Sequence, residues 1–161
     1  MVDDGAVTYE IPRVPASAGA LLTDGAGRLL VVKPTYKSGW TLPGGQIEDS
    51  GESPWEGCRR EVAEETGLEV VAGRLAAVDF LRPRGTRPGG LRFLFDCGPV
   101  TDAQIATITL QEEELAEYRF ADRDEAARLL RGPLARRVAA VRGRTATVYL
   151  EEGVPVDGVG P

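Results

Sequence analysis

Three glutamates in the middle of the chain, Glu61, Glu64 and Glu65, stand at the spacing of one helical face. Residues three and four positions apart on a helix are neighbours, so these carboxylates would share a stripe about 100° wide. Their repulsion costs roughly a few tenths of a kcal/mol per pair in an isolated helix. A hard divalent cation would offset this repulsion, and ligands that are all oxygen favour Mg²⁺ or Mn²⁺. The alternative interpretation is a solvated acidic face, because glutamate is a common helix-favouring residue.

The helix that would carry these glutamates has clear start and stop signals. Ser53 suits the N-cap, Pro54 suits the first helical position, and Glu56 completes a capping box with the serine. Gly67 suits the left-handed residue that follows a helix. The sequence therefore predicts a helix over 54–66. A neighbouring stripe of this helix is expected to pack on a sheet, and it comprises Trp55, Cys58, Val62 and Thr66.

The composition narrows the possible chemistry. The 161 residues include no histidine, which excludes a Ser-His-Asp triad, a Cys-His pair and a histidine-bound zinc. The net charge of −6 disfavours nucleic acid as a partner. Cys58 and Cys97 lack metal-ligand spacing and are expected to stay reduced. Because no long apolar run and no signal-peptide pattern is found, we expect no membrane association and a cytoplasmic location.

Alternating apolar residues, glycines and prolines predict the other elements of a single domain covering 1–161. Strands are expected at 16–23, 28–33, 40–42, 68–82 with a break at Gly73, 91–98, 118–121 and 146–150. The first two would form a hairpin. Further helices are expected from Asp122 to about Arg131 and from Gly132 onward, with 1–15 an irregular lead-in and 153–161 a mobile tail. This order indicates an α/β fold in which a mixed sheet packs between helices.

The stretch Gly45–Leu68 resembles the Nudix box, written G-x5-E-x7-R-E-U-x-E-E-x-G-U with U a bulky aliphatic residue. All nine fixed residue types are present in order, and the preceding Leu-Pro-Gly-Gly matches the usual lead-in. The sequence departs from the pattern at one place. Six residues rather than five separate Gly45 from Glu52, which changes the position of Glu52 relative to the glycines but leaves the helix in register.

The resemblance implies a Nudix α/β/α sandwich with a loop-helix-loop catalytic motif. It also implies metal-dependent hydrolysis of a pyrophosphate linkage, with Mg²⁺ as cofactor and Mn²⁺ as a substitute. The metal ligands would be Glu61, Glu64, Glu65 and the carbonyl of Gly44. Arg60 would orient Glu61 by a charge-assisted hydrogen bond, while Glu52 and Gly45 would support the site.

A carboxylate must act as the general base, because histidine is absent. In the family this base is a box glutamate or a glutamate on a later loop. Glu112 is our choice within the acidic loop, although a solvated surface loop would have the same composition. Substrate contacts are expected from arginines around the glycine-rich loop 82–90 and from a lysine at a strand end, although an ordinary flexible loop would look the same. These residues are Arg82, Arg84, Arg87 and Arg92 around the loop, and Lys33 at the strand end.

The implied substrate is a nucleoside diphosphate linked to another moiety, such as a nucleoside triphosphate, an oxidised nucleotide or a nucleotide sugar. Pro83, fifteen residues after the box, loosely resembles a proline of ADP-ribose-specific members, so that specificity is an alternative. An alternative of another class is a nucleotide-sensing domain that binds without cleaving. Such relatives usually lack a box glutamate, whereas this sequence has them all. Family members often form homodimers, which is possible here.

Overall fold

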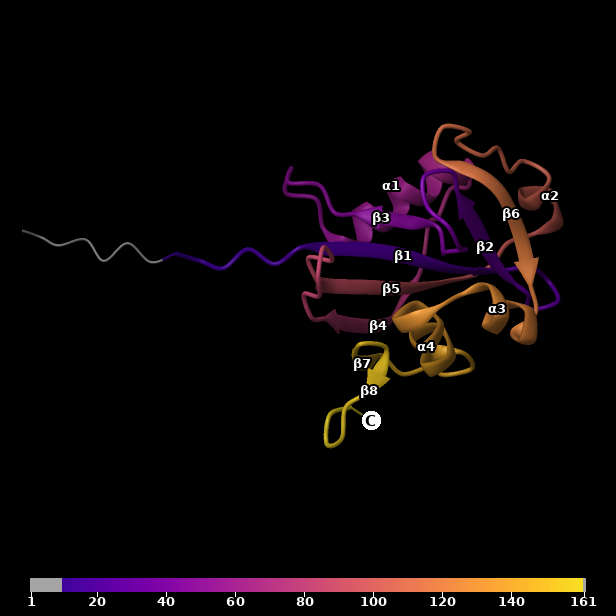
Figure 1. The fold of residues 1–161 in the computed structure, drawn as a ribbon. Coiled ribbons are helices and arrows are strands. Elements are labelled where there is room, and N and C mark those ends of the chain that lie inside the picture. Colours follow the sequence, from indigo (N-terminus) through magenta and orange to yellow (C-terminus); the bar gives the residue numbers. More distant parts are fainter. Residues whose placement is uncertain (1–9, 161) are drawn as a thin grey trace, which may run out of the picture.

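The computed structural model describes residues 10–160, and its strands form one mixed sheet (Figure 1). The strands are β1 (Ala16–Thr23), β2 (Leu29–Pro34), β3 (Gly44–Gln46), β4 (Arg74–Leu81), β5 (Gly90–Pro99), β6 (Leu115–Ala121), β7 (Val148–Glu151) and β8 (Val154–Pro155). Their order is β6-β2-β1-β5-β4-β7-β8, and β3 pairs separately with β1. The β1–β5 and β4–β7 pairs are parallel, and the others are antiparallel.

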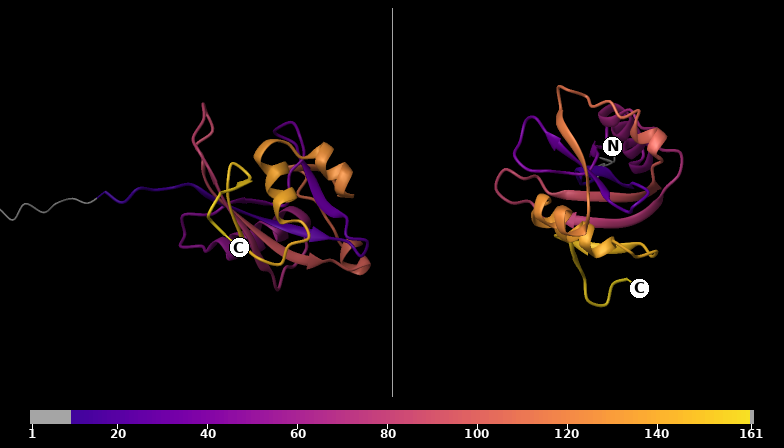
Figure 2. Two further views of the ribbon diagram at one scale, coloured as in Figure 1. Left: turned by 90° about the horizontal axis from the view of Figure 1, so that it is seen from below. Right: turned by 90° about the vertical axis from the view of Figure 1, so that its right-hand side faces the viewer.

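Helices cover both faces of this sheet (Figure 2). They are α1 (Pro54–Thr66), α2 (Asp102–Ile105), α3 (Arg123–Leu129) and α4 (Gly132–Val141). One hydrophobic core lies between α1 and the sheet and includes Cys58 and Val62. A second lies on the other face, where Val138 and Val141 of α4 are buried. The α/β prediction of a mixed sheet between helices is confirmed.

The predicted first hairpin is also confirmed, and its strands separate soon after the turn. The Asp24 carboxylate accepts hydrogen bonds from the backbone N–H of Ala26 and Arg28, which fixes the turn. Next to the turn, Thr23 pairs with Leu29. Farther from the turn, β1 pairs with β5 and β2 pairs with β6. The short strand β3 pairs with the beginning of β1. The glycines of β3 therefore lie next to the first residues of β1 and beside α1.

The predicted ends of α1 agree with the structure. The Ser53 hydroxyl accepts from the Glu56 N–H at 3.2 Å, and the Glu56 carboxylate accepts from the Ser53 N–H at 2.8 Å. Gly67 follows the helix with φ of 73°, in the left-handed region. Cys58, Val62 and Thr66 are fully buried, and the Trp55 ring lies 5.1 Å from that of Phe95, between centroids. Both caps and the buried stripe therefore fix which face α1 turns to the sheet.

Some sequence-based predictions of elements were wrong. A strand was expected at 40–42, but Thr41 makes only an isolated bridge with Val32, and β3 begins after Pro43. Residues 68–73 are not a strand, although Leu68 and Val70 are buried, because burial of alternate side chains does not require a pairing partner. The helix α2 was not predicted, despite a capping box between Thr101 and Gln104. The expected tail begins with a short ordered strand, because β8 pairs with β7.

Residues 1–9 and 161 lie outside the described part of the chain, and residues 10–15 form no helix or strand. Among residues 10–160, no helix is both long and apolar enough to cross a membrane. Both cysteines are free thiols. The pKa of the Cys97 thiol is raised by a hydrogen bond with Cys58 and by burial, which keeps this thiol protonated at neutral pH.

Candidate active site

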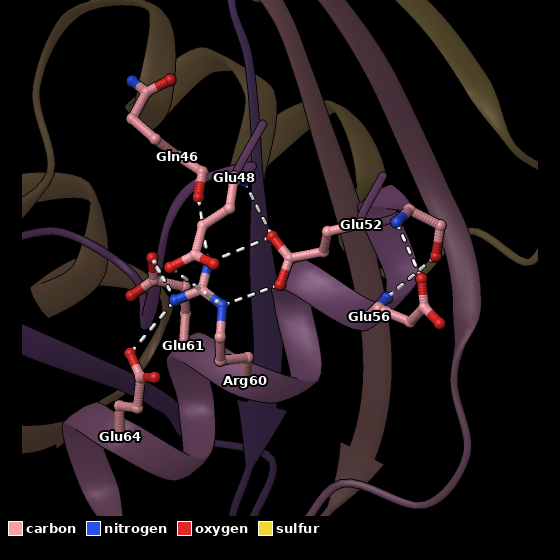
Figure 3. Close-up of polar contacts among 8 residues, drawn as sticks. Gln46, Glu48, Glu52, Glu56, Arg60, Glu61 and Glu64 are labelled. Atoms are coloured by element: carbon pink, nitrogen blue, oxygen red, sulfur yellow. Dashed lines mark hydrogen bonds and ion pairs between the residues drawn. The ribbon is translucent and has the colours of Figure 1, made fainter. Parts of the chain in front are cut away.

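Arg60 lies at the centre of an ion-pair network on the exposed side of α1 (Figure 3). Its Nε donates to Glu52 at 2.7 Å, and its Nη1 lies 3.1 Å from both Glu61 and Glu64. Its Nη2 donates to the carbonyl of Gln46 at 3.1 Å. The predicted contact between Arg60 and Glu61 is therefore present, and the guanidinium also binds Glu52 and Glu64. One cation holds the loop and the helix together.

The extra residue before Glu52 is accommodated in an exposed turn. Residues 49–51 form this turn, in which Gly51 adopts φ of 83°. Glu52 returns to the site, where it accepts from the Glu48 N–H at 2.9 Å and from Arg60. The hydrogen bond from Arg60 and the one from Glu48 hold the pKa of Glu52 below its usual range. Glu52 therefore supports Arg60, and the insertion leaves that contact intact.

Glu65 occupies the most enclosed position among the three glutamates. It is only 5% exposed, and its carboxylate accepts a hydrogen bond from the Gly44 N–H at 2.9 Å. The pKa of Glu65 is raised to about 7, chiefly by burial and also by the charges of Glu61 and Glu114, against the opposing hydrogen bond from the Gly44 N–H. A carboxyl group that is buried beside other carboxylates is a frequent feature of functional sites.

The two glycines of β3 allow the backbone to approach these carboxylates. A Cβ at Gly45 would overlap the carboxylate of Glu61, and one at Gly44 would overlap the carbonyl of Ala18 on β1. Gly44 also has φ of 146°, which L side chains rarely adopt. Gly44 therefore requires glycine because its neighbour is backbone, whereas a side chain at Gly45 would displace the carboxylate of Glu61.

The donor chemistry of this site suits a hard divalent cation. Burial raises the pKa of Glu61, as do the charges of Glu64 and Glu114, although Arg60 opposes this. Within residues 10–160, no three side chains converge as a preformed metal cage, and Glu64 is half exposed and paired with Arg60. Oxygen ligands with surplus negative charge fit a hard cation such as Mg²⁺ or Mn²⁺.

The site opens into a cavity of about 510 Å³. Its acidic lining comes from α1 and the loop before β6, with Glu61, Glu65 and Glu114. Its basic lining comes from β5 and α4, with Arg92 and Arg137, and from Lys37 in the loop after β2. Residues of β1, β3 and β5 also line it. Cavities of this size commonly hold small molecules.

A model of the NUDIX domain family matches residues 13–141 of this chain. The chain belongs to the Nudix hydrolase superfamily. A MutT-like protein from Streptomyces ambofaciens is 38% identical over 73 residues, which cover 45% of this chain and 44% of that protein. The matched region is thus less than half of this curated relative.

Solved structures agree with this membership. A MutT protein from Methanosarcina mazei has a TM-score of 0.61 and 29% identity, covering 76% of this chain and 86% of that one. A NUDIX hydrolase from Nitrosomonas europaea has a TM-score of 0.66 and 20% identity, covering 92% and 97% of the two chains. The second likeness bears on the fold alone. The resemblance read from residues 45–68 is confirmed as family membership.

Of the predicted substrate cations, Arg92 lines the cavity of this Nudix domain, whereas Arg82, Arg84, Arg87 and Lys33 do not. Arg82 pairs with Glu151 at 2.9 Å, and Arg87 pairs with Glu152 at 2.9 Å. Arg84 forms a backbone bridge with Arg87, and Lys33 is exposed on β2, likewise outside the lining. The cations that face the cavity are Arg92, Arg137 and Lys37. Sequence reasoning overlooked the last two, because only tertiary packing distinguishes them from other surface cations.

In the acidic loop, the structure brings Glu114 rather than Glu112 to the Nudix box. Glu114 lines the cavity, and its charge raises the pKa of both Glu61 and Glu65. The Glu114 carbonyl accepts from the Thr35 N–H at 2.8 Å, which ties the loop to the end of β2. Glu112 is exposed and does not line the cavity. The loop was predicted from its composition, but the residue within it depends on where the turn before β6 ends.

Proposed function

We propose that this chain hydrolyses the pyrophosphate linkage of a nucleoside diphosphate joined to another moiety, with Mg²⁺ as cofactor. The observation that carries the proposal is the burial of Glu65 beside Glu61 and Glu114 in a cavity that also presents cations. Family membership independently supports phosphoanhydride chemistry. The expectations of a cytoplasmic location and a possible homodimer stay predictions.

The metal would be held by Glu61, Glu64, Glu65 and the carbonyl of Gly44, with Mn²⁺ as a substitute. When bound, such a cation polarises phosphate oxygens and makes a water molecule more acidic. Other residues of the chain hold the carboxylates in position. Arg60 fixes Glu61 through its 3.1 Å ion pair, and the Gly44 N–H fixes Glu65. These contacts hold the carboxylates in place before substrate arrives, which lowers the cost of organising the transition state.

The general base in this proposal is Glu114, in place of Glu112. A base must reach the attacking water, and only Glu114 of these two lines the cavity. It lies close enough to Glu61 and Glu65 for its charge to act on both.

Substitution of the acidic loop tests this assignment. Glu114→Gln is expected to lower kcat by roughly 10²- to 10⁴-fold, the usual contribution of general base catalysis. Glu112→Gln makes the same charge change in the same loop and should leave kcat within about twofold of the parent. The measurement is steady-state hydrolysis at saturating Mg²⁺. The reverse ranking of the two variants would restore Glu112 as the base.

A panel of diphosphate compounds tests the function itself. Nucleoside triphosphates, oxidised triphosphates, ADP-ribose and nucleotide sugars are incubated with Mg²⁺, and released phosphate-bearing fragments are identified by mass spectrometry. We expect turnover of at least one class, and loss of that turnover with EDTA. ADP-ribose as the preferred compound would support the alternative specificity. Saturable binding without turnover of any compound, with Mg²⁺ or Mn²⁺, would favour the nucleotide-sensing alternative.

A further inference from the structure

Arg92 is half-buried, and it forms no ion pair with any carboxylate of residues 10–160. Its guanidinium donates to two backbone carbonyls instead, that of Leu91 at 3.0 Å and that of Gly89 at 3.0 Å. The side chain lines the cavity that contains the Nudix glutamates. A cation removed from water without a counter-charge costs free energy, so its retention in the cavity wall needs a compensating partner.

The carboxylate opposite Arg92 in the sheet is paired with another arginine. Asp79 lies directly opposite Arg92 in the β4–β5 pair, so their side chains share one face of the sheet. The Oδ2 of Asp79 accepts from Arg137 Nε at 2.8 Å and pairs with Nη2 at 2.7 Å. Its Oδ1 accepts from the Gly153 N–H at 3.0 Å. Asp79 is fully buried, and the contacts of its two oxygens are to Arg137 and Gly153 rather than to Arg92.

The local charge is therefore positive. The Asp79 carboxylate pairs with Arg137 and not with Arg92, and both arginines line the cavity, so two cations stand against one carboxylate. Burial lowers the pKa of Arg92, and the charges of Arg137 and Arg87 lower it further, while Asp79 opposes this. This positive end lies on β5 and α4, whereas the acidic end lies on α1 and the loop before β6. Because the chain has a net charge of −6, this basic end of the cavity does not follow from a generally basic composition.

We propose that Arg92, supported by Arg137, binds a second phosphate group of the substrate, outside the pyrophosphate linkage that is cleaved. This inference rests on the proposed function and narrows its substrate class. A guanidinium matches the paired oxygens of a phosphate and binds them by two parallel hydrogen bonds. The phosphate supplies the counter-charge that Arg92 lacks. The preferred substrates are then diphosphate compounds that carry a further phosphate, rather than those joined to a neutral sugar.

Anion binding by the metal-free protein tests the subsite without any turnover. Melting temperatures are measured in EDTA with added inorganic phosphate or tripolyphosphate, against sodium chloride at the same ionic strength. The parent protein should be stabilised by both phosphates, and Arg92→Gln should lose most of this stabilisation. Arg84→Gln removes an equal charge from the neighbouring loop, outside the cavity, and should keep it. Equal stabilisation of Arg92→Gln and the parent, or none of the parent, would overturn the proposal.

The stability of the variant without ligand provides a second readout. Because Arg92 has no counter-charge, Arg92→Gln should fold with an unchanged or higher melting temperature in the absence of phosphate. If that variant fails to fold, Arg92→Lys keeps the charge without the planar fork and should bind tripolyphosphate several-fold more weakly than the parent. Unchanged binding by Arg92→Lys would also contradict the proposed geometry.

Kinetics with matched substrates connects the subsite to the reaction. ADP-ribose is compared with its 2′-phosphate and 1″-phosphate derivatives. For at least one derivative, Arg92→Gln should lower kcat/KM by roughly 10- to 100-fold, in line with the usual strength of charged hydrogen bonds. For ADP-ribose the change should be small. Stabilisation by phosphate without hydrolysis of any compound would reject the proposed function and retain the subsite. Hydrolysis without stabilisation by phosphate would reject the subsite and retain the proposed function.

Discussion

Glu65→Gln is expected to reduce diphosphate hydrolysis by several orders of magnitude and, at the same time, to stabilise the metal-free protein above pH 7. Activity falls because an amide is a poor ligand for Mg²⁺ compared with a carboxylate. Stability rises because the ionised form of Glu65 is unfavourable where it lies, 5% exposed beside Glu61 and Glu114. Glutamine keeps an oxygen that can accept from the Gly44 N–H.

The pH dependence of this stabilisation follows from proton binding. Burial raises the pKa of Glu65 from 4.5 to about 7. Between these values the unfolded chain releases its proton while the folded protein retains it, so the free energy of unfolding falls as the pH rises through this range. The full shift corresponds to a free energy on the order of 3 kcal/mol. The glutamine variant lacks this loss, so its advantage should be absent near pH 4 and complete by about pH 8.

Glu64→Gln is the matched control on the same helix. Glu64 is half exposed and bound to Arg60, so its substitution should change stability little at either pH. It should nevertheless lower kcat by orders of magnitude, because Glu64 is an equal part of the proposed ligand set. Unfolding in urea at pH 5 and pH 8, with EDTA, measures the first effect. Near-normal activity of both variants would reject the metal assignment, and a pH-independent stability gain would reject the role of burial.

The catalytic helix was readable from the sequence because its determinants are local. Ser53, Glu56 and Gly67 fix its ends within a few residues of the chain, and the glutamate spacing fixes its acidic face. The same holds for the turn at Asp24, whose carboxylate accepts from the N–H groups of Ala26 and Arg28. These are contacts between near neighbours, and no tertiary structure is needed to anticipate them.

The basic end of the cavity depends on contacts between distant segments. Arg92 faces Asp79 only through the register of β4 and β5, and Arg137 reaches Asp79 across 58 positions of the chain. The composition of the loop favoured Arg82 and Arg87 instead, which pair with Glu151 at the end of β7 and with Glu152 directly after it. An arginine's sequence neighbours do not reveal whether its counter-charge is provided elsewhere. An arginine that has a counter-charge elsewhere in the structure is already paired, whereas one that lacks it is a candidate for binding an anionic ligand.

Asp79→Asn is expected to lower the free energy of unfolding by about 3 kcal/mol, since removal of one partner leaves a buried charge unpaired. Asp79 is fully buried and Arg137 nearly so. Loss of the carboxylate leaves Arg137 and Arg92 as two adjacent cations and weakens the acceptor for the Gly153 N–H, which anchors the turn before β8. Asp96→Asn is the matched control. The Asp96 pair with Arg74 is partly exposed at 3.3 Å, so it should cost less than about 1 kcal/mol.

The same variant separates a structural role from one in the subsite. Asp79→Asn increases the positive charge around Arg92, so inorganic phosphate should stabilise this variant more than it stabilises the parent, whereas Arg92→Gln should be stabilised less. The two substitutions therefore shift phosphate binding in opposite directions although they alter adjacent positions of one sheet face. An Asp79→Leu/Arg137→Met double variant removes the buried pair together and should recover much of the stability lost by Asp79→Asn. Equal stability losses in the single and double variants would show that packing, rather than the unpaired charge, dominates at this position.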